Sequence, residues 1–177
     1  MGESPPTPSA LIVLVGAPGT GKSTLARSIL DRFPGTLVQT DAVRKQLFAT
    51  PKYTAAESRR VYAEAQRRIR RGLEREVRVL FDATNLREAN RRSLYGIADR
   101  ATARMLVIVA WAPEEVIRAR MDSRKAGPDP LDYSDADWAV YLQLRRTADP
   151  IQQPHLLVNT TVGLEPALRA IRRHLEE

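Results

Sequence analysis

The sequence of 177 residues has no cysteine and only two histidines. These absences exclude a disulfide scaffold, a thiol nucleophile and an ordinary zinc site, because zinc sites take most of their ligands from those two residue types. The longest wholly apolar run, Met105 to Ala112, is too short to span a bilayer. We therefore expect a cytoplasmic protein with no membrane partner.

What the chain has in excess is positive charge. Its net charge is +7, and 24 of its 28 lysines and arginines are arginines. This excess of positive charge is expected for a protein that binds an anionic substrate or a nucleic acid. It is expected equally for a protein from an arginine-rich proteome, in which case it says nothing about function. The length and the 43% hydrophobic fraction predict one folded domain at residues 11–177. Residues 1–10, with three prolines, are expected to be a disordered tail.

The strongest signal is a glycine-rich segment between an apolar run and a helical pattern. Glycine, four residues, glycine, lysine and serine is the spacing of a P-loop, whose backbone N–H groups surround phosphate. In such a loop Lys22 reaches the β- and γ-phosphates and Ser23 ligates Mg²⁺. The motif predicts binding of ATP, or another nucleoside triphosphate, with Mg²⁺. Its residues are Gly16, Ala17, Pro18, Gly19, Thr20, Gly21, Lys22, Ser23 and Thr24.

Five short apolar segments alternate with helical patterns along the chain. This alternation predicts an α/β fold with a parallel sheet that is covered by helices on both faces. Ligands of such sheets bind beyond the carboxyl ends of the strands, where the P-loop, Asp41 and Asp82 are expected to gather. The predicted strands are residues 11–15, 36–40, 77–82, 105–111 and 155–159.

Polar residues that follow the second and third predicted strands are candidates for chemistry. Asp41 and Arg44 share a face of a helix, so Asp41 is placed to accept the proton of an attacking hydroxyl while Arg44 holds substrate. The alternative for Asp41 is a helix cap with a surface ion pair. Asp82 is a candidate for Mg²⁺ or acceptor binding, or again for a simple cap. Thr84 and Asn85 are weaker candidates for substrate contacts.

Two groups of arginines have a functional and a structural interpretation. Arg120 and Arg124 lie on the apolar stripe of a predicted helix, where an inward guanidinium needs an anion such as a triphosphate. Alternatively, both side chains extend past the core to water. The basic run at residues 67–71 either follows a phosphate backbone or forms the solvated side of a helix. No aromatic residues are interleaved there for base stacking.

Four short motifs resemble those of P-loop kinases of the polynucleotide 5′-kinase and zeta-toxin kind. They are GAPGTGKST, TDAVR, FDATN and RMDSR, the last from Arg120 to Arg124. The resemblance implies a three-layer fold with the strand order 2-3-1-4-5 and a helical lid at about residues 118–136. It also implies catalytic roles for Lys22, for Asp41 as general base, for Arg44 as acceptor-phosphate ligand, and for the two lid arginines.

The expected reaction is transfer of the γ-phosphoryl group to a hydroxyl, with the 5′-hydroxyl of RNA or DNA as the favoured acceptor. Residues 133–137 resemble small kinases found beside aminoglycoside-phosphotransferase-like domains, which makes a sugar, nucleoside or antibiotic the alternative. A nucleotide-dependent binding switch is the competing class, and it has no use for an acid–base residue at Asp41. GTPase and transporter-ATPase signatures are absent from the sequence. The oligomeric state stays open.

Overall fold

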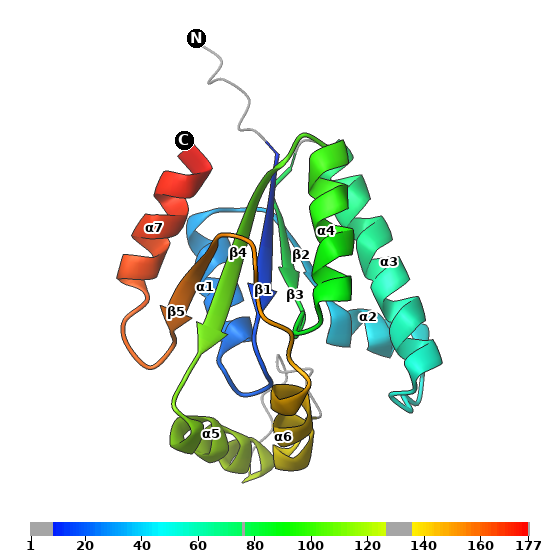
Figure 1. Ribbon diagram of the computed structural model, residues 1–177, viewed down its shortest axis with the longest axis vertical. Coiled ribbons are helices and arrows are strands. Elements are labelled where there is room, and N and C mark those ends of the chain that lie inside the picture. Colours follow the sequence, from blue (N-terminus) through cyan, green and yellow to red (C-terminus); the bar gives the residue numbers. More distant parts are fainter. Residues whose placement is uncertain (1–8, 76, 127–135, 177) are drawn as a thin grey trace.

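The computed structural model describes residues 9–75, 77–126 and 136–176. Its centre is a five-stranded parallel sheet with the order β2-β3-β1-β4-β5, shown in Figure 1. The predicted fold class and strand order are therefore confirmed. The strands are β1 (Ala10–Val15), β2 (Thr36–Gln39), β3 (Val79–Asp82), β4 (Arg104–Trp111) and β5 (His155–Asn159).

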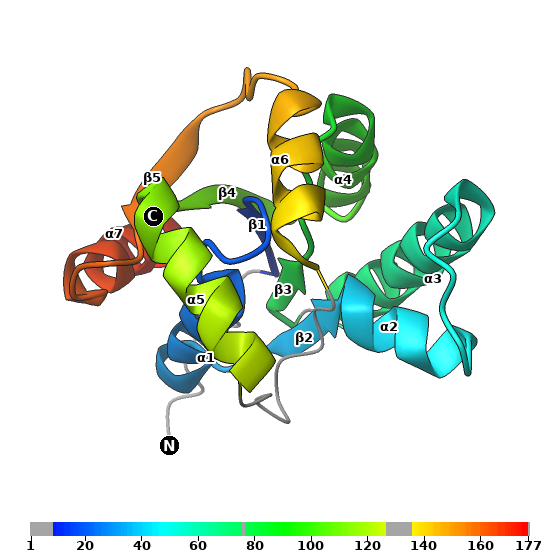
Figure 2. The ribbon, with the colours of Figure 1, turned by 90° about the horizontal axis from the view of Figure 1, so that it is seen from below.

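Helices cover both faces of this sheet, and two more lie beyond the carboxyl ends of its strands. In Figure 1, α1 and α7 lie on one side of the sheet and α3 and α4 on the other, with α5 and α6 at the lower end. Figure 2 looks onto that end, where α5 crosses in front of the strand ends. The helices are α1 (Lys22–Arg32), α2 (Thr40–Leu47), α3 (Ala55–Glu74), α4 (Glu88–Arg100), α5 (Glu114–Ala126), α6 (Trp138–Arg146) and α7 (Glu165–Glu176).

The central strand β1 is buried along its whole length. Side chains alternate along a strand, so Ile12 and Leu14 enter the core under α1 and α7, whereas Leu11 and Val13 enter the core under α3 and α4. A strand buried on both faces has to be continuously apolar. The unbroken apolar run before the P-loop is therefore explained by its place in the middle of the sheet.

Three local boundaries differ from, or refine, the predictions. Strand β1 starts at Ala10, within the segment that was expected to be a tail, while residues 1–8 lie outside the described residues. Strand β3 starts at Val79, because the N–H of Val77 still donates to Gly72 O at the end of α3. Helix α3 begins after its cap residue Thr54, whose side chain accepts from the N–H of Glu57. No helix among the described residues is long and apolar enough to cross a membrane.

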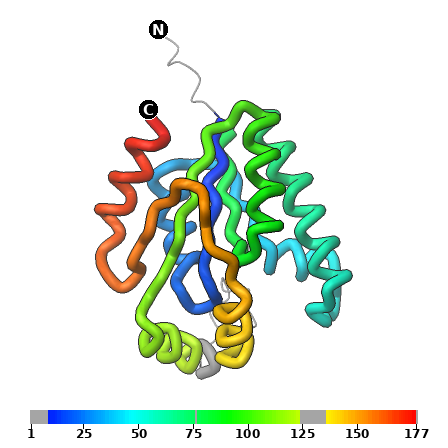
Figure 3. The backbone as a smooth tube through the Cα atoms, in the orientation of Figure 1, coloured from blue at the N-terminus to red at the C-terminus, as the bar shows by residue number. Residues whose placement is uncertain are grey.

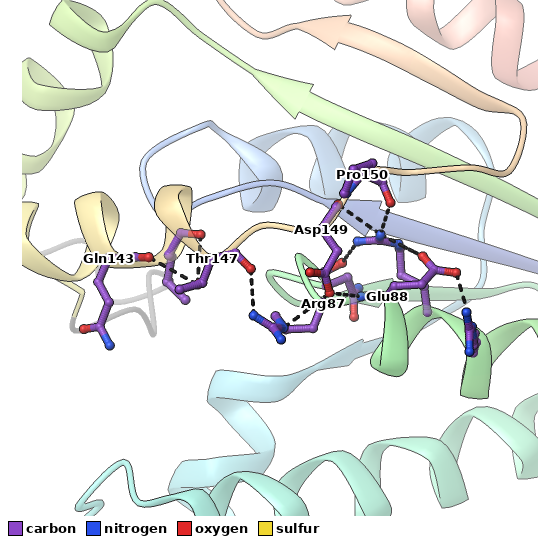
Figure 4. Close-up of polar contacts among 10 residues, drawn as sticks. Arg87, Glu88, Gln143, Thr147, Asp149 and Pro150 are labelled. Carbon is purple, nitrogen blue, oxygen red and sulfur yellow. Dashed lines mark hydrogen bonds and ion pairs between the residues drawn. The ribbon is translucent and has the colours of Figure 1, made fainter.

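A buried arginine attaches the segment after α6 to the start of α4. Arg91 has no exposed surface, and its guanidinium donates to the Glu88 carboxylate and to the carbonyls of Asn85, Asp149 and Pro150, over 2.7–3.1 Å. Figure 4 shows the polar contacts around Glu88, Asp149 and Pro150, and Figure 3 shows the segment between α6 and β5 running along the sheet. The turn after β3 is thereby held at a defined place beside the P-loop.

Candidate active site

A cavity of about 830 Å³ opens at the carboxyl ends of β1, β2 and β3. One wall is formed by the P-loop and the start of α1, and another by the ends of β2 and β3 with the residues that follow them. Helix α5 and the loop after β5 close the remaining side. The cavity therefore lies where parallel α/β sheets bind their ligands.

The P-loop is packed tightly beneath α5 and against the loop after β5. Gly19 and Gly21 have φ angles of +80° and +84°, which side chains rarely adopt. A Cβ at Gly19 would lie 2.8 Å from Ile117 Cγ2, and one at Gly21 would lie 2.9 Å from Thr160 Oγ1. Glycine is therefore required at both positions by conformation and by space.

The amino end of α1 faces the cavity. The helix begins at Lys22, its cap residue Gly21 offers no side chain, and no acidic residue lies in the first turn. The unpaired N–H groups and the positive end of the helix dipole are therefore available to an anion. Lys22 lines the cavity and its ammonium donates to Ala17 O over 2.9 Å.

Ser23 and Asp82, the two predicted Mg²⁺ residues, lie in contact. The Ser23 hydroxyl donates to Asp82 Oδ2 over 3.0 Å, and the Gln39 amide donates to the same oxygen over 3.0 Å. Hydroxyl and carboxylate oxygens suit Mg²⁺, which completes its shell with water and substrate phosphates. In the described part of the chain, no group of three or more His, Cys, Asp or Glu residues forms a metal cage. The donor set thus fits a Mg²⁺ ion shared with a nucleotide.

Asp41 lines the same cavity, on the wall formed by the ends of β2 and β3 and the residues that follow them. It lies in the first turn of α2, whose cap residue is Gln39, so Asp41 itself is not the cap that its position suggested. A carboxylate in the first turn of a helix is stabilised by the helix dipole. The cavity therefore brings together the P-loop, the Ser23–Asp82 pair and a second carboxylate.

Arg44 does not line the cavity, although it is three residues from Asp41. Its side chain is only 8% exposed and faces α3, where Nη1 lies 3.5 Å from Glu57 Oε2 and Nη2 donates to Ser58 Oγ over 3.3 Å. The ring of Tyr53 stacks on the guanidinium at 4.8 Å. Asp41 therefore lines the cavity, whereas the Arg44 side chain is engaged with α3.

Thr84 and Asn85 have different surroundings. Thr84 lines the cavity, and its carbonyl accepts from the N–H of Gly16 over 3.0 Å. Asn85 is fully buried with a φ angle of +48°, and its amide donates to Leu14 O over 2.7 Å. Asn85 therefore connects the turn after β3 to β1, and it does not line the cavity. Nearby, burial raises the pKa of the Tyr62 phenol.

Arg120 reaches over the P-loop from α5. Its guanidinium donates to Gly19 O over 3.2 Å, and to Thr160 Oγ1 and Thr160 O over 3.0 Å each. Thr160 Oγ1 in turn donates to Thr20 O over 2.7 Å. Arg124 belongs to the same helix, but its side chain lies outside the described residues, as do residues 127–135 of the expected lid.

Sequence reasoning missed Thr160, which joins α5 to the P-loop. Thr160 directly follows the apolar strand β5, so the rule that identified Asp41 and Asp82, a polar residue at a strand end, would have found it. Glu57 lies in the first turn of α3, three residues after the cap residue Thr54. Its contact with Arg44 depends on how α2 packs against α3, which no local pattern encodes.

The basic run of residues 67–71 lies on α3. Arg67 and Arg68 both donate to the Glu64 carboxylate, over 2.7 and 2.8 Å. These hydrogen bonds hold the pKa of Glu64 at about 2. Part of the positive charge of this run is therefore neutralised within the helix itself.

Known proteins share this arrangement. A family model described as an AAA domain matches residues 11–151. A candidate kinase from Chloroflexus aurantiacus j-10-fl has a TM-score of 0.72 and 24% identity, covering 98% of both chains. Kti12 from Chaetomium thermophilum, solved with ADP-AlF3, has a TM-score of 0.75 and 19% identity, covering 94% of this chain and 97% of its own.

The APS kinase CysC of Mycobacterium tuberculosis, solved with AMPPNP and APS, has a TM-score of 0.68 and 14% identity, with coverage of 97% of this chain and 100% of its own. Among curated proteins, none matches the sequence significantly. These likenesses agree with the observed fold. The chain belongs to the AAA_33 family of AAA domains, and its fold is that of a small P-loop kinase.

Proposed function

We propose that this protein is a Mg²⁺-dependent phosphotransferase that moves the γ-phosphoryl group of ATP, or another nucleoside triphosphate, to an acceptor hydroxyl. The observation that carries the proposal is the cavity itself. It is lined by the P-loop, by the Ser23–Asp82 pair and by the carboxylate of Asp41. A kinase needs a phosphate-binding loop, Mg²⁺ ligands and a carboxylate for the attacking hydroxyl within one site.

The donor side of the site would bind the triphosphate through backbone N–H groups of the P-loop and the ammonium of Lys22. Ser23 and Asp82 would hold Mg²⁺, which when bound neutralises charge on the phosphate oxygens. Arg120 contacts the P-loop, where its guanidinium would stabilise negative charge on the transferred phosphoryl group. Arg124, on the same helix, is proposed for the same role.

Asp41 would act as the general base. It accepts the proton of the acceptor hydroxyl while that oxygen forms its bond to the γ-phosphorus, and the bond from the γ-phosphorus to the β-phosphate oxygen breaks. The products are the phosphorylated acceptor and the nucleoside diphosphate. Thr84, on the same wall, is placed to donate or accept a hydrogen bond from the acceptor.

Two acceptor classes fit this chemistry. A 5′-hydroxyl of RNA or DNA is supported by the net charge of +7 and by the Asp41–Arg44 spacing. A small molecule, such as a sugar, nucleoside or antibiotic, is supported by the burial of Arg44, which leaves the acceptor wall without the expected phosphate ligand. The likeness in fold to an APS kinase agrees with the second class. We favour the small-molecule acceptor.

The replacement Lys22→Ala tests the phosphotransferase assignment. The variant should no longer transfer radiolabel from γ-labelled ATP, because it lacks the ammonium that binds the β- and γ-phosphates. The acceptors tested are water and a panel of sugars, nucleosides, antibiotics and 5′-hydroxyl oligonucleotides. Circular dichroism should show an unchanged fold. Undiminished transfer by this variant would contradict the assignment.

A further inference from the structure

The distribution of charged residues around the cavity indicates which acceptor molecules the site binds. This inference rests on the proposed function. We propose that Glu57 holds Arg44 away from the acceptor site, so that the site selects acceptors without a phosphate beside the reacting hydroxyl. Glu57 would then be a specificity-determining residue, although it does not line the cavity.

The acceptor wall presents oxygen-rich, uncharged or acidic groups. Among the described residues, the cationic side chains that line the cavity are Lys22, Arg27 and Arg120, and all three belong to the P-loop, α1 or α5. The ends of β2 and β3 contribute carboxylates, hydroxyls and an amide instead. Such groups pair well with hydroxyl or amino groups and leave a phosphate without a cationic partner. The acceptor-wall residues are Gln39, Thr40, Asp41, Asp82 and Thr84.

Arg44, on α2, could supply a cation for an acceptor phosphate, but its guanidinium is paired with Glu57 of α3. The side chains of Arg44 and Glu57 are 8% and 12% exposed, and their charged atoms lie 3.5 Å apart. Two charges at that distance in a poorly hydrated place attract each other strongly. The pair keeps the guanidinium in the contact between α2 and α3.

Glu57 is itself held in position. Both of its carboxylate oxygens accept from the N–H of Lys52, over 3.1 and 3.0 Å. It also lies in the first turn of α3, where the helix dipole favours a negative charge. The carboxylate that retains Arg44 is therefore fixed by the loop before α3 as well as by the helix.

The hydrogen bonds of Arg44 are incomplete. Its Nε and Nη1 atoms are buried without a hydrogen-bond partner among the described residues, and Glu57 is near enough only for charge attraction. An unsatisfied buried guanidinium is costly, so loss of the Glu57 charge should release it toward another anion. Because Arg44 lies one helical turn from Asp41, the released side chain reaches the acceptor wall.

The test compares wild type, Glu57→Gln and the matched control Glu64→Gln. Both replacements remove one carboxylate from α3 that contacts arginine, and glutamine keeps a carbonyl oxygen for the N–H of Lys52. The probes are adenosine and adenosine 3′-monophosphate, which differ only in a phosphate near the 5′-hydroxyl. Their affinities are measured by calorimetry with Mg²⁺ and a non-hydrolysable ATP analogue.

We expect Glu57→Gln to raise the preference for the phosphorylated probe by about tenfold or more, through a new charge-assisted hydrogen bond. Wild type and Glu64→Gln should show no such preference. A wild-type preference of tenfold for the phosphorylated probe would overturn the inference. The inference would also be overturned if Glu57→Gln had the same ratio of affinities for the two probes as wild type, or if neither probe bound to it more tightly.

A measurement on the wild type covers the case in which Glu57→Gln does not fold. Binding of a 5′-hydroxyl decanucleotide should be absent or almost independent of salt, whereas a slope that corresponds to three or more phosphates would refute the inference. The kinase function is judged separately, by phosphoryl transfer in wild type and in Lys22→Ala. Phosphate affinity gained by Glu57→Gln in a protein that transfers nothing would refute the kinase function, and with it acceptor selection, while still showing that Glu57 keeps Arg44 from binding phosphate in the cavity.

Discussion

The Ser23 hydroxyl donates to Asp82 Oδ2 over 3.0 Å, although 59 residues separate the two in the sequence. The contact arises because β1 and β3 are parallel neighbours, so that the P-loop after one and the aspartate at the end of the other meet at the same edge. Gln39, at the end of β2, binds the same carboxylate oxygen. Three adjacent segments thus define the position of one oxygen atom.

Replacement of Asp82 by asparagine should weaken Mg²⁺ binding in the presence of nucleotide by about 10- to 100-fold. Asparagine keeps an acceptor for Ser23 and Gln39 but removes the charge that attracts the ion. The Mg²⁺ concentration for half-maximal phosphoryl transfer is the quantity to measure. If it does not change, Asp82 is only a structural partner of Ser23.

The Asp41→Asn variant separates a kinase from a nucleotide-dependent switch. A kinase should lose about 100-fold or more in kcat, the usual contribution of a general base, while its affinity for a non-hydrolysable ATP analogue stays the same. The two quantities are measured by radiolabel transfer and by calorimetry. Equal turnover in variant and wild type would favour the switch.

Stability in acid should depend on Glu64. Hydrogen bonds from Arg67 and Arg68 lower the pKa of this exposed carboxyl from 4.5 in a model peptide to about 2. Because the pKa is lowered in the folded state, the stabilisation is fully present above about pH 4.5 and is lost as the pH falls toward 2. Between pH 6 and pH 3, the urea midpoint of wild type should fall more than that of Glu64→Gln. Equal decreases would show that the pair contributes nothing in water.

Arg91→Met should lower the free energy of unfolding by roughly 3–5 kcal/mol, as expected when one partner of a buried charged network is removed. The change leaves the carbonyls of Asn85, Asp149 and Pro150 without their donor. Urea unfolding provides the measurement, and exposed Arg92→Met, on the next position of the same helix, is the control. A loss below about 1 kcal/mol would mean that water replaces the guanidinium.

Much of the site follows from local rules. A few neighbouring residues are enough to predict the P-loop, the apolar strand β1 and the aspartates at the ends of β2 and β3. Parallel strands then bring Asp41 and Asp82 to one edge without further information. The strand order itself came from resemblance to a kinase family, because alternation of strands and helices predicts a parallel sheet but not its order.

Features that depend on packing between elements escaped prediction. Helical spacing places Asp41 and Arg44 on one face of α2, but it does not reveal that α3 presents Glu57 to the arginine. An arginine at position 91 would be expected on the surface of α4. It is buried because its guanidinium donates to the carbonyls of Asp149 and Pro150, which lie 58 and 59 residues further along the chain. Asn85 is a third case, since its backbone is left-handed and its amide contacts Leu14 O, 71 residues earlier in the chain.

The same Arg91 contacts have a consequence for the order of folding. They join the start of α4 to the segment before β5, and such long-range contacts form only after the entropy of closing a large loop has been lost. We therefore expect the β1–α4 region to assemble first and β5, the edge strand, to be added late. Changes at Arg91 would then accelerate unfolding far more than they slow folding. The lifetime of the folded protein would then depend on a side chain that does not line the candidate active site.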